Sequence, residues 1–154
     1  MGEPRSEASR FEDFVGYIGA LAKEIQRIKA TESAHLGLQG ADIMALYYLG
    51  HSESGMTGAE LARAAGVTRA AISRTLARME REGFVTVSGS SDTSSRYKAP
   101  VVLTEQGRSA AVAADQRIHY VMEQVVQAQS DEERAQMYDS LERVLACLKG
   151  LSRD

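Results

Sequence analysis

The sequence predicts an α+β fold that is mostly α, in which one β-hairpin interrupts a series of helices. Along most of the chain, apolar residues recur at alternating steps of three and four, the period of an amphipathic helix. Near residues 84–104 this period gives way to β-branched and aromatic residues, which are typical of strands. The length of 154 residues, with 44% hydrophobic and 25% charged, indicates one soluble globular domain, placed at residues 1–154.

The N-terminal part of the chain predicts two helices. The first helix runs from about residue 8 to 30 and carries one apolar stripe along its length. The stripe consists of Phe11, Phe14, Ile18, Leu21, Ile25 and Ile28. A second helical segment at residues 41–49 is followed by Gly50, which lacks a Cβ atom and suits a left-handed C-terminal cap.

A short helix pair and a hairpin follow. Thr57 and Glu60 form a capping box that opens a helix at residues 60–65, and Gly66 then breaks the chain. Thr68 can cap the next helix, at about residues 69–82, which ends at Gly83. The strand-like segments FVTVSGS and RYKAPVVLT come next, separated by Ser, Asp and Thr, and they predict a β-hairpin.

Two long helices end the chain. Thr104 can cap a helix at about residues 105–128, and Ser130 with Glu133 forms a second capping box before a helix at 131–149. Together with the helix at 8–30, they carry apolar faces wider than the short helix pair and hairpin can cover. Packing within one chain is the simpler explanation. The length of the stripe on the first helix favours an intertwined homodimer instead.

A short helix, a tight turn, a second helix and a hairpin describe a winged helix-turn-helix, here with flanking dimerisation helices. On the helix at 69–82, Ile72, Leu76 and Met79 share the face expected to pack inward. The opposite face carries Ala70, Arg74, Ala77, Arg78 and Arg81. Small alanines would let this helix approach closely, as insertion into a DNA major groove requires.

The charge distribution supports a nucleic-acid partner. The chain has a net charge of −3, yet residues 61–98 alone carry +4. Arginines on a helix usually face solvent, and Arg78 can pair with Glu82 one turn later. Because these arginines lie on the second helix of a capped pair and directly before a basic hairpin, we favour DNA contact. Arg69, Ser73 and Arg74 are the expected base readers, and Arg78 the expected phosphate contact.

At these residues the sequence resembles the MarR family of bacterial transcription regulators. The resemblance is carried by GAELARAAGVTRAAISRTLARMEREGFV and by SSDTSSRYKAPVVLTEQG. It implies a DNA-binding lobe at residues 36–104 and dimerisation helices at 8–30 and 105–149. It also implies a homodimer that binds a palindromic operator, commonly as a repressor that releases DNA on binding a small phenolic ligand.

The resemblance further assigns the wing. The family usually carries Asp-x-Arg-Asp-Arg-Arg there, so Asp92 matches its first Asp and Arg96 the arginine that enters the minor groove. Ser95 stands where an Asp would orient that arginine, and Lys98 partly replaces lost positive charge. The complete set of expected DNA contacts is Thr68, Arg69, Ala70, Ser73, Arg74, Arg78, Arg96 and Lys98.

The same resemblance places an effector pocket between the dimer helices and the DNA-binding lobe. The residues that can line it are Tyr47, Tyr48, His51 and Tyr120. Each of them can equally be an ordinary packing residue. The spacing of the three histidines predicts no metal site, and we expect no cofactor. Cys147 stands among leucines of the last helix, where a buried small hydrophobe is more common than a redox thiol.

Other function classes are less well supported. The sequence shows no nucleophile–base pair and no phosphate-binding glycine loop, so we do not expect an enzyme. A dimeric protein-interaction adaptor is the alternative, but it would have no need of a basic helix followed by a basic wing. One cysteine and the lack of a secretory signal or a long apolar run predict a cytoplasmic protein without membrane segments.

Overall fold

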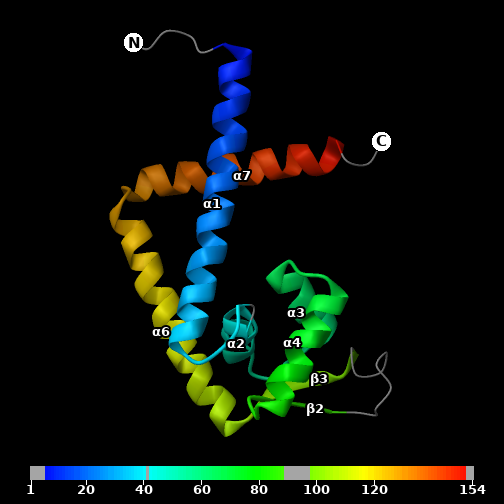
Figure 1. Ribbon diagram of the computed structural model, residues 1–154. Coiled ribbons are helices and arrows are strands. Elements are labelled where there is room, and N and C mark those ends of the chain that lie inside the picture. The colour runs from blue at the N-terminus through cyan, green and yellow to red at the C-terminus, as the bar shows by residue number, and fades with distance from the viewer. Residues whose placement is uncertain (1–5, 41, 89–97, 152–154) are drawn as a thin grey trace. The chain divides into compact units, whose positions relative to one another are not determined.

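The computed structural model describes residues 6–40, 42–88 and 98–151, which divide between two compact units, residues 1–115 and 116–154 (Figure 1). The first unit contains three strands and most of the helices, and the second contains the end of α6 and all of α7. The expected mostly helical α+β fold is confirmed. The helices are α1 (Glu7–His35), α2 (Asp42–Gly50), α3 (Gly58–Ala65), α4 (Arg69–Arg81), α6 (Glu105–Gln127) and α7 (Asp131–Leu151).

A small antiparallel sheet completes the first unit. Strand β3 (Pro100–Leu103) lies in the centre, between β1 (Met56–Thr57) and β2 (Val85–Val87). The pairing of β2 with β3, in which Val85 lies opposite Leu103, confirms the expected hairpin. The residues between these strands, 89–97, fall outside the described ranges. Strand β1 was not predicted, because two residues are too few to show an alternating pattern.

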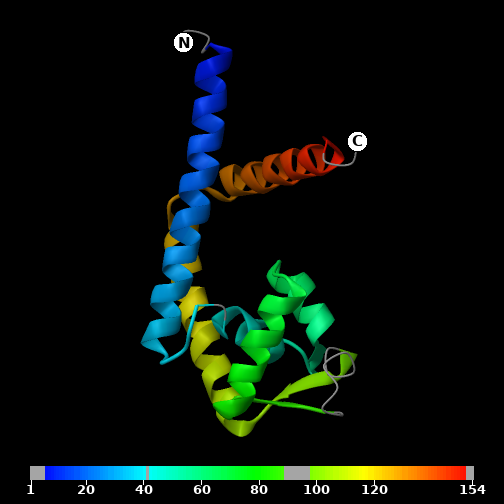
Figure 2. The ribbon, with the colours of Figure 1, turned by 45° about the vertical axis from the view of Figure 1, so that its right-hand side comes forward.

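The core of the first unit joins α2, α3, α4 and the sheet. Helices α3 and α4 pack against each other, and α4 leads directly into β2 (Figures 1 and 2). The largest fully buried apolar side chains come from all of these elements: Ile43, Leu46, Leu61, Met79, Val85 and Val101. Burial of apolar surface between these elements is the main force that holds the short helices of the lobe together.

The capping residues act as the sequence predicts. The Thr57 hydroxyl accepts a hydrogen bond from the Glu60 N–H at 3.1 Å, and the Glu60 carboxylate accepts one from the Thr57 N–H at 2.8 Å. Hydrogen bonding to the Glu60 carboxylate, first from the Thr57 backbone N–H and then from the Thr57 side chain, lowers the pKa of Glu60. Ser130 and Glu133 form the same reciprocal pair before α7. Both capping boxes are therefore confirmed.

Gly50 is a correction. It is the last residue of α2 and is absent from the glycines with positive φ among the described residues, so it is no left-handed cap. A Cβ atom at this position would lie 3.1 Å from the Cβ of Ala111 in α6. The glycine instead permits a close approach of α2 and α6, a contact that local sequence does not reveal.

The second unit is a helical segment with much exposed apolar surface. Helix α7 has no buried residue. Its exposed apolar side chains are Tyr138, Leu141, Leu145, Leu148 and Leu151. Helix α1 in the first unit is similar, since Phe11, Val15 and Leu21 are at least half exposed. No described helix combines the length and apolarity needed to cross a membrane.

Candidate nucleic-acid interface

Two turns set the position of α4. Gly66 closes α3 with φ +66, and the Val67 N–H donates to the Ala62 carbonyl at 3.0 Å. This left-handed closure suits glycine, because other side chains are strained there. The Thr68 hydroxyl then accepts from the Ala71 N–H at 3.2 Å and caps α4. The predicted helix–turn–helix is thus confirmed, and the turn spans only Gly66–Thr68.

The inward face of α4 is the predicted one. Ile72, Leu76 and Met79 are buried, and Thr75 is buried with them. The outer face carries Arg69, Ala70, Arg74, Ala77 and Arg81, all exposed, and Ser73 is half-buried beside them. Of the expected base readers, Arg69 and Arg74 are therefore presented to solvent from the first two turns of the helix. The small side chains of Ala70 and Ala77 leave room for a close approach to this face of the helix.

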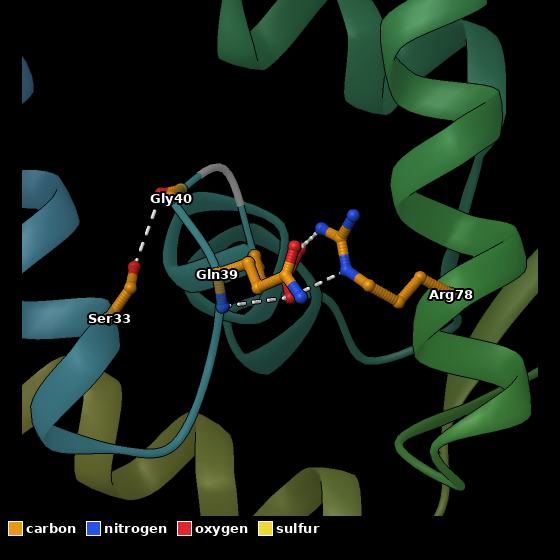
Figure 3. A network of polar contacts seen from close by, with 5 residues as sticks. Ser33, Gln39, Gly40 and Arg78 are labelled. Atoms are coloured by element: carbon orange, nitrogen blue, oxygen red, sulfur yellow. Dashed lines mark hydrogen bonds and ion pairs between the residues drawn. The ribbon is translucent and has the colours of Figure 1, made fainter.

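Arg78 does not join this face, contrary to expectation. Its Nη2 donates to Oδ1 of Asp42, and its Nε lies 3.4 Å from Oδ2 of the same carboxylate (Figure 3). The side chain of Arg78 is 21% exposed, whereas that of Asp42 is fully buried. A buried carboxylate requires a partner, and Arg78 supplies it from the neighbouring helix. In this structure the guanidinium is therefore engaged by Asp42 within the lobe.

Asp42 belongs to a polar network at the start of α2. The Gln39 N–H donates to Asp42 Oδ2 at 3.2 Å, and the Ser33 hydroxyl at the end of α1 donates to the Gly40 carbonyl at 3.2 Å (Figure 3). Sequence reasoning missed Asp42. The available signal was one acidic residue opening the apolar run IMAL, a position where burial requires a cation.

The wing is described only at its base. Lys98 is exposed two residues before β3 begins, as a DNA contact would require. Arg96 and the neighbouring Asp92 and Ser95 lie outside the described residues, so their assignment stays a prediction. Close to the wing, Arg108 of α6 donates from Nη1 to the Leu103 carbonyl at 3.1 Å. Its guanidinium thereby lies beside the end of β3.

Three of the four expected effector residues lie together. The ring centroids of Tyr47 and Tyr48 are 5.3 Å apart, and those of Tyr47 and His51 are 4.6 Å apart. His51 Nε2 lies 2.8 Å from Oδ1 of Asp115 in α6. Tyr120 belongs to the second unit, where the Arg117 guanidinium lies 5.4 Å from its ring centroid.

The remaining candidates for chemistry on the described part of the chain are metal ligands and the cysteine. No group of three His, Cys, Asp or Glu side chains able to hold a metal ion occurs among the described residues. Cys147 is exposed on α7 in the single chain, which corrects the expectation of a buried residue.

Comparison with known proteins agrees with this geometry. Residues 36–96 match the sequence profile of the MarR family. No curated protein matches the chain. Among solved structures, the MepR–DNA complex of S. aureus is similar over 88% of this chain and 97% of that one, with a TM-score of 0.76 and 20% identity.

Two further structures extend the comparison. A MarR/EmrR family regulator from Acinetobacter sp. ADP1 has a TM-score of 0.75 at 17% identity, covering 90% of this chain and 96% of its own. The Mycobacterium tuberculosis MarR family protein Rv2887, in complex with p-aminosalicylic acid, has a TM-score of 0.59 at 24% identity, covering 84% and 97%. Residues 36–96 thus resemble the MarR family, and the chain has the winged-helix fold of these solved structures.

Proposed function

We propose that the protein is a sequence-specific DNA-binding regulator that acts as a homodimer on a palindromic operator, as a ligand-responsive repressor and without enzymatic activity. The observation that carries this proposal is the exposed outer face of α4. It combines arginines in the first two turns with alanines that allow close approach. An arginine that reaches a guanine edge can pair with both O6 and N7, a contact worth about 1–3 kcal/mol of discrimination. DNA binding also implies that the protein works in the cytoplasm.

The contacts divide into two groups by position. The N-terminal half of α4 enters the groove, with Arg69, Ala70, Ser73 and Arg74 near bases and Thr68 beside the backbone. Arg96 and Lys98 of the wing contact the minor groove and its phosphates. Arg78 is left out of this set because its guanidinium binds Asp42.

The dimer rests on apolar surface that the single chain leaves exposed. Helix α1 exposes Phe11 at 68%, Tyr17 at 66% and Leu21 at 56%, and α7 exposes Leu145 at 52%. Large apolar side chains exposed along a helix in this way mark an interface, because apolar patches on monomeric proteins are small. Residues 8–30 and 105–149 are therefore the proposed dimerisation helices of a DNA-binding lobe at residues 36–104. A two-fold dimer would set two α4 helices about one DNA turn apart, roughly 34–36 Å.

The proposed response to an effector rests on one ligand-bound relative and on a group of aromatic rings in this chain. Rv2887 was solved with p-aminosalicylic acid, a small aromatic carboxylate. In this chain the Tyr47, Tyr48 and His51 rings form one aromatic group beside Asp115. A flat aromatic ligand can stack on such rings, and a ring N–H of His51 can donate to its carboxylate. The role of Tyr120, in the second unit, stays a prediction from the sequence.

Selection of duplexes from a random-sequence library tests DNA reading directly. The wild-type protein should enrich a palindromic sequence, and Arg74→Ala should lower the ratio of operator to random-DNA affinity by about 5- to 150-fold. Arg27→Ala, shown by light scattering to keep the oligomeric state of the wild-type protein, is the control for the loss of one exposed arginine, because Arg27 pairs with Glu24 on α1. A wild-type protein that enriches no sequence would favour the alternative, a dimeric adaptor for other proteins.

A further inference from the structure

One threonine joins the end of α4 to the start of α6. The Thr104 hydroxyl donates to the Gly83 carbonyl at 2.6 Å and accepts from the Gly107 N–H at 3.0 Å. The Thr104 backbone N–H donates to the Phe84 carbonyl at 3.0 Å. A single side chain thus caps α6 and binds the turn that closes α4.

The turn that Thr104 holds is the rigid C-terminal closure of α4. Gly83 has φ +85, and the Phe84 N–H donates to the Met79 carbonyl at 2.9 Å while the Gly83 N–H donates to the Glu80 carbonyl at 3.1 Å. This pair of bonds is a Schellman motif, which ends the helix at a left-handed residue and ties the turn to the last carbonyls of α4. A displacement of the turn therefore displaces α4 itself.

Gly107 brings the first turn of α6 against the backbone of Phe84, directly after the closure of α4. A Cβ atom on Gly107 would overlap the Phe84 carbonyl oxygen and lie 2.9 Å from the Phe84 carbonyl carbon. Only glycine allows the first turn of α6 to approach the Phe84 backbone this closely. The sequence LTEQG therefore encodes a joint: Thr104 bonds the two helix ends, and Gly107 makes room for the contact.

The geometry of α4 amplifies small movements at this joint. A helix of 13 residues is about 20 Å long, so a tilt of roughly 3° about its C-terminal end moves its first turn by about 1 Å. Arg69 and Ser73 lie at or near that distant end. Hydrogen bonds to base edges tolerate much less than such a shift before they weaken.

We propose that Thr104 is a positioning residue for DNA reading, whose hydroxyl fixes the tilt of the recognition helix α4 relative to α6. This inference rests on the proposed function of α4. The alternative is that Thr104 only caps α6. The two roles use different properties of the hydroxyl, because the cap needs its oxygen as an acceptor and the joint needs its proton as a donor.

Substitutions at position 104 separate the two roles. Thr104→Asp keeps an acceptor for the Gly107 N–H but cannot donate to the Gly83 carbonyl once ionised. Thr104→Ser keeps both properties. Thr57→Val is the matched control, because Thr57 is a capping threonine of the same lobe whose hydroxyl bonds Glu60 of α3. Circular dichroism and urea unfolding establish that each variant is folded.

The measurement is the ratio of affinities for the duplex selected by the wild-type protein and for random DNA, each taken over a range of salt. Thr104→Asp should lower this ratio about tenfold, the scale of one misaligned arginine–guanine contact. Thr104→Ser and Thr57→Val should keep the wild-type ratio. Random-DNA binding reports the general effect of the added charge, so that effect cancels in the ratio.

Each outcome decides something. A folded Thr104→Asp protein with the wild-type ratio would show that the cap alone matters and would overturn the positioning role. An equal loss in Thr104→Ser would assign the effect to the lost methyl group and overturn the role of the hydroxyl. A wild-type protein that selects no sequence would refute DNA reading itself, and the positioning role with it.

Discussion

Removing either partner of the Asp42–Arg78 pair should destabilise the protein, but by unequal amounts. In Arg78→Met the Asp42 carboxylate stays fully buried and loses its cation, while it keeps the Gln39 N–H as a hydrogen-bond donor. Breaking a buried ion pair in this way costs about 3–5 kcal/mol. For a chain of this length, that cost corresponds to a decrease in Tm of roughly 6–20 °C.

Asp42→Asn should cost less. The amide introduced at position 42 remains an acceptor for the Gln39 N–H, and the Arg78 side chain is 21% exposed, so its guanidinium can be hydrated. The double variant Asp42→Asn with Arg78→Met should then be more stable than Arg78→Met alone, because no uncompensated charge stays buried. Arg74→Met is the matched control on the exposed face of the same helix and should change stability by no more than about 0.5 kcal/mol.

Urea unfolding followed by circular dichroism, at one fixed protein concentration, gives the four free energies of the double-mutant cycle. A coupling free energy near zero would refute this account of the pair. An Arg78→Met variant as stable as Arg74→Met would do the same, since it would show that Asp42 is compensated without Arg78.

Other substitutions test separate features of the chain. Gly107→Ala should destabilise the fold by at least about 1–3 kcal/mol in urea unfolding, because the added methyl overlaps the Phe84 carbonyl. Because the pKa of Glu60 is lower in the folded protein than its unfolded value of about 4.5, ionised Glu60 should stabilise the fold above pH 4.5. This stabilisation should be lost as the pH falls through the folded pKa, so Glu60→Gln should flatten the acid limb of a stability–pH curve. Ile18→Asp should convert the proposed dimer to a 16.7 kDa monomer in light scattering, since it places a charge within the apolar face of α1. Arg96→Ala should weaken binding most at operators with A·T-rich flanks in titrations that vary only the flanks, because a narrow minor groove attracts arginine.

Local features of this chain were predictable, because their cause lies within a few residues. The Thr57–Glu60 and Ser130–Glu133 boxes, the Thr68 cap and the closures at Gly66 and Gly83 each depend on residues within one helical turn. The inward face of α4 followed from periodicity alone. Element boundaries shifted most at α1, which continues to His35, five residues beyond the predicted end.

Features that depend on distant residues were missed or misassigned. Asp42 and Arg78 are 36 positions apart, and nothing near either residue indicates that they meet. Gly50 is explained by Ala111, and β1 exists only because β3 pairs with it. A helical wheel placed Arg78 on the exposed face because it lies at the edge between faces, where a long side chain can turn either way.

The position of Arg78 changes how the basic segment 61–98 should act on DNA. The segment carries +4 by sequence, but one of its cations is bound inside the lobe by Asp42, a residue outside the segment. Counterion release depends on the phosphates that are contacted, with a slope of about −0.9 in log affinity against log salt for each one. An arginine whose guanidinium stays paired with Asp42 contributes nothing to that slope. The folded double variant Asp42→Asn with Arg78→Met should therefore bind random DNA with the wild-type salt slope, whereas loss of an arginine that contacts phosphate would lower it by about one unit per half-site. A lower slope in the double variant would return Arg78 to the DNA-contact set and show that it leaves Asp42 on binding.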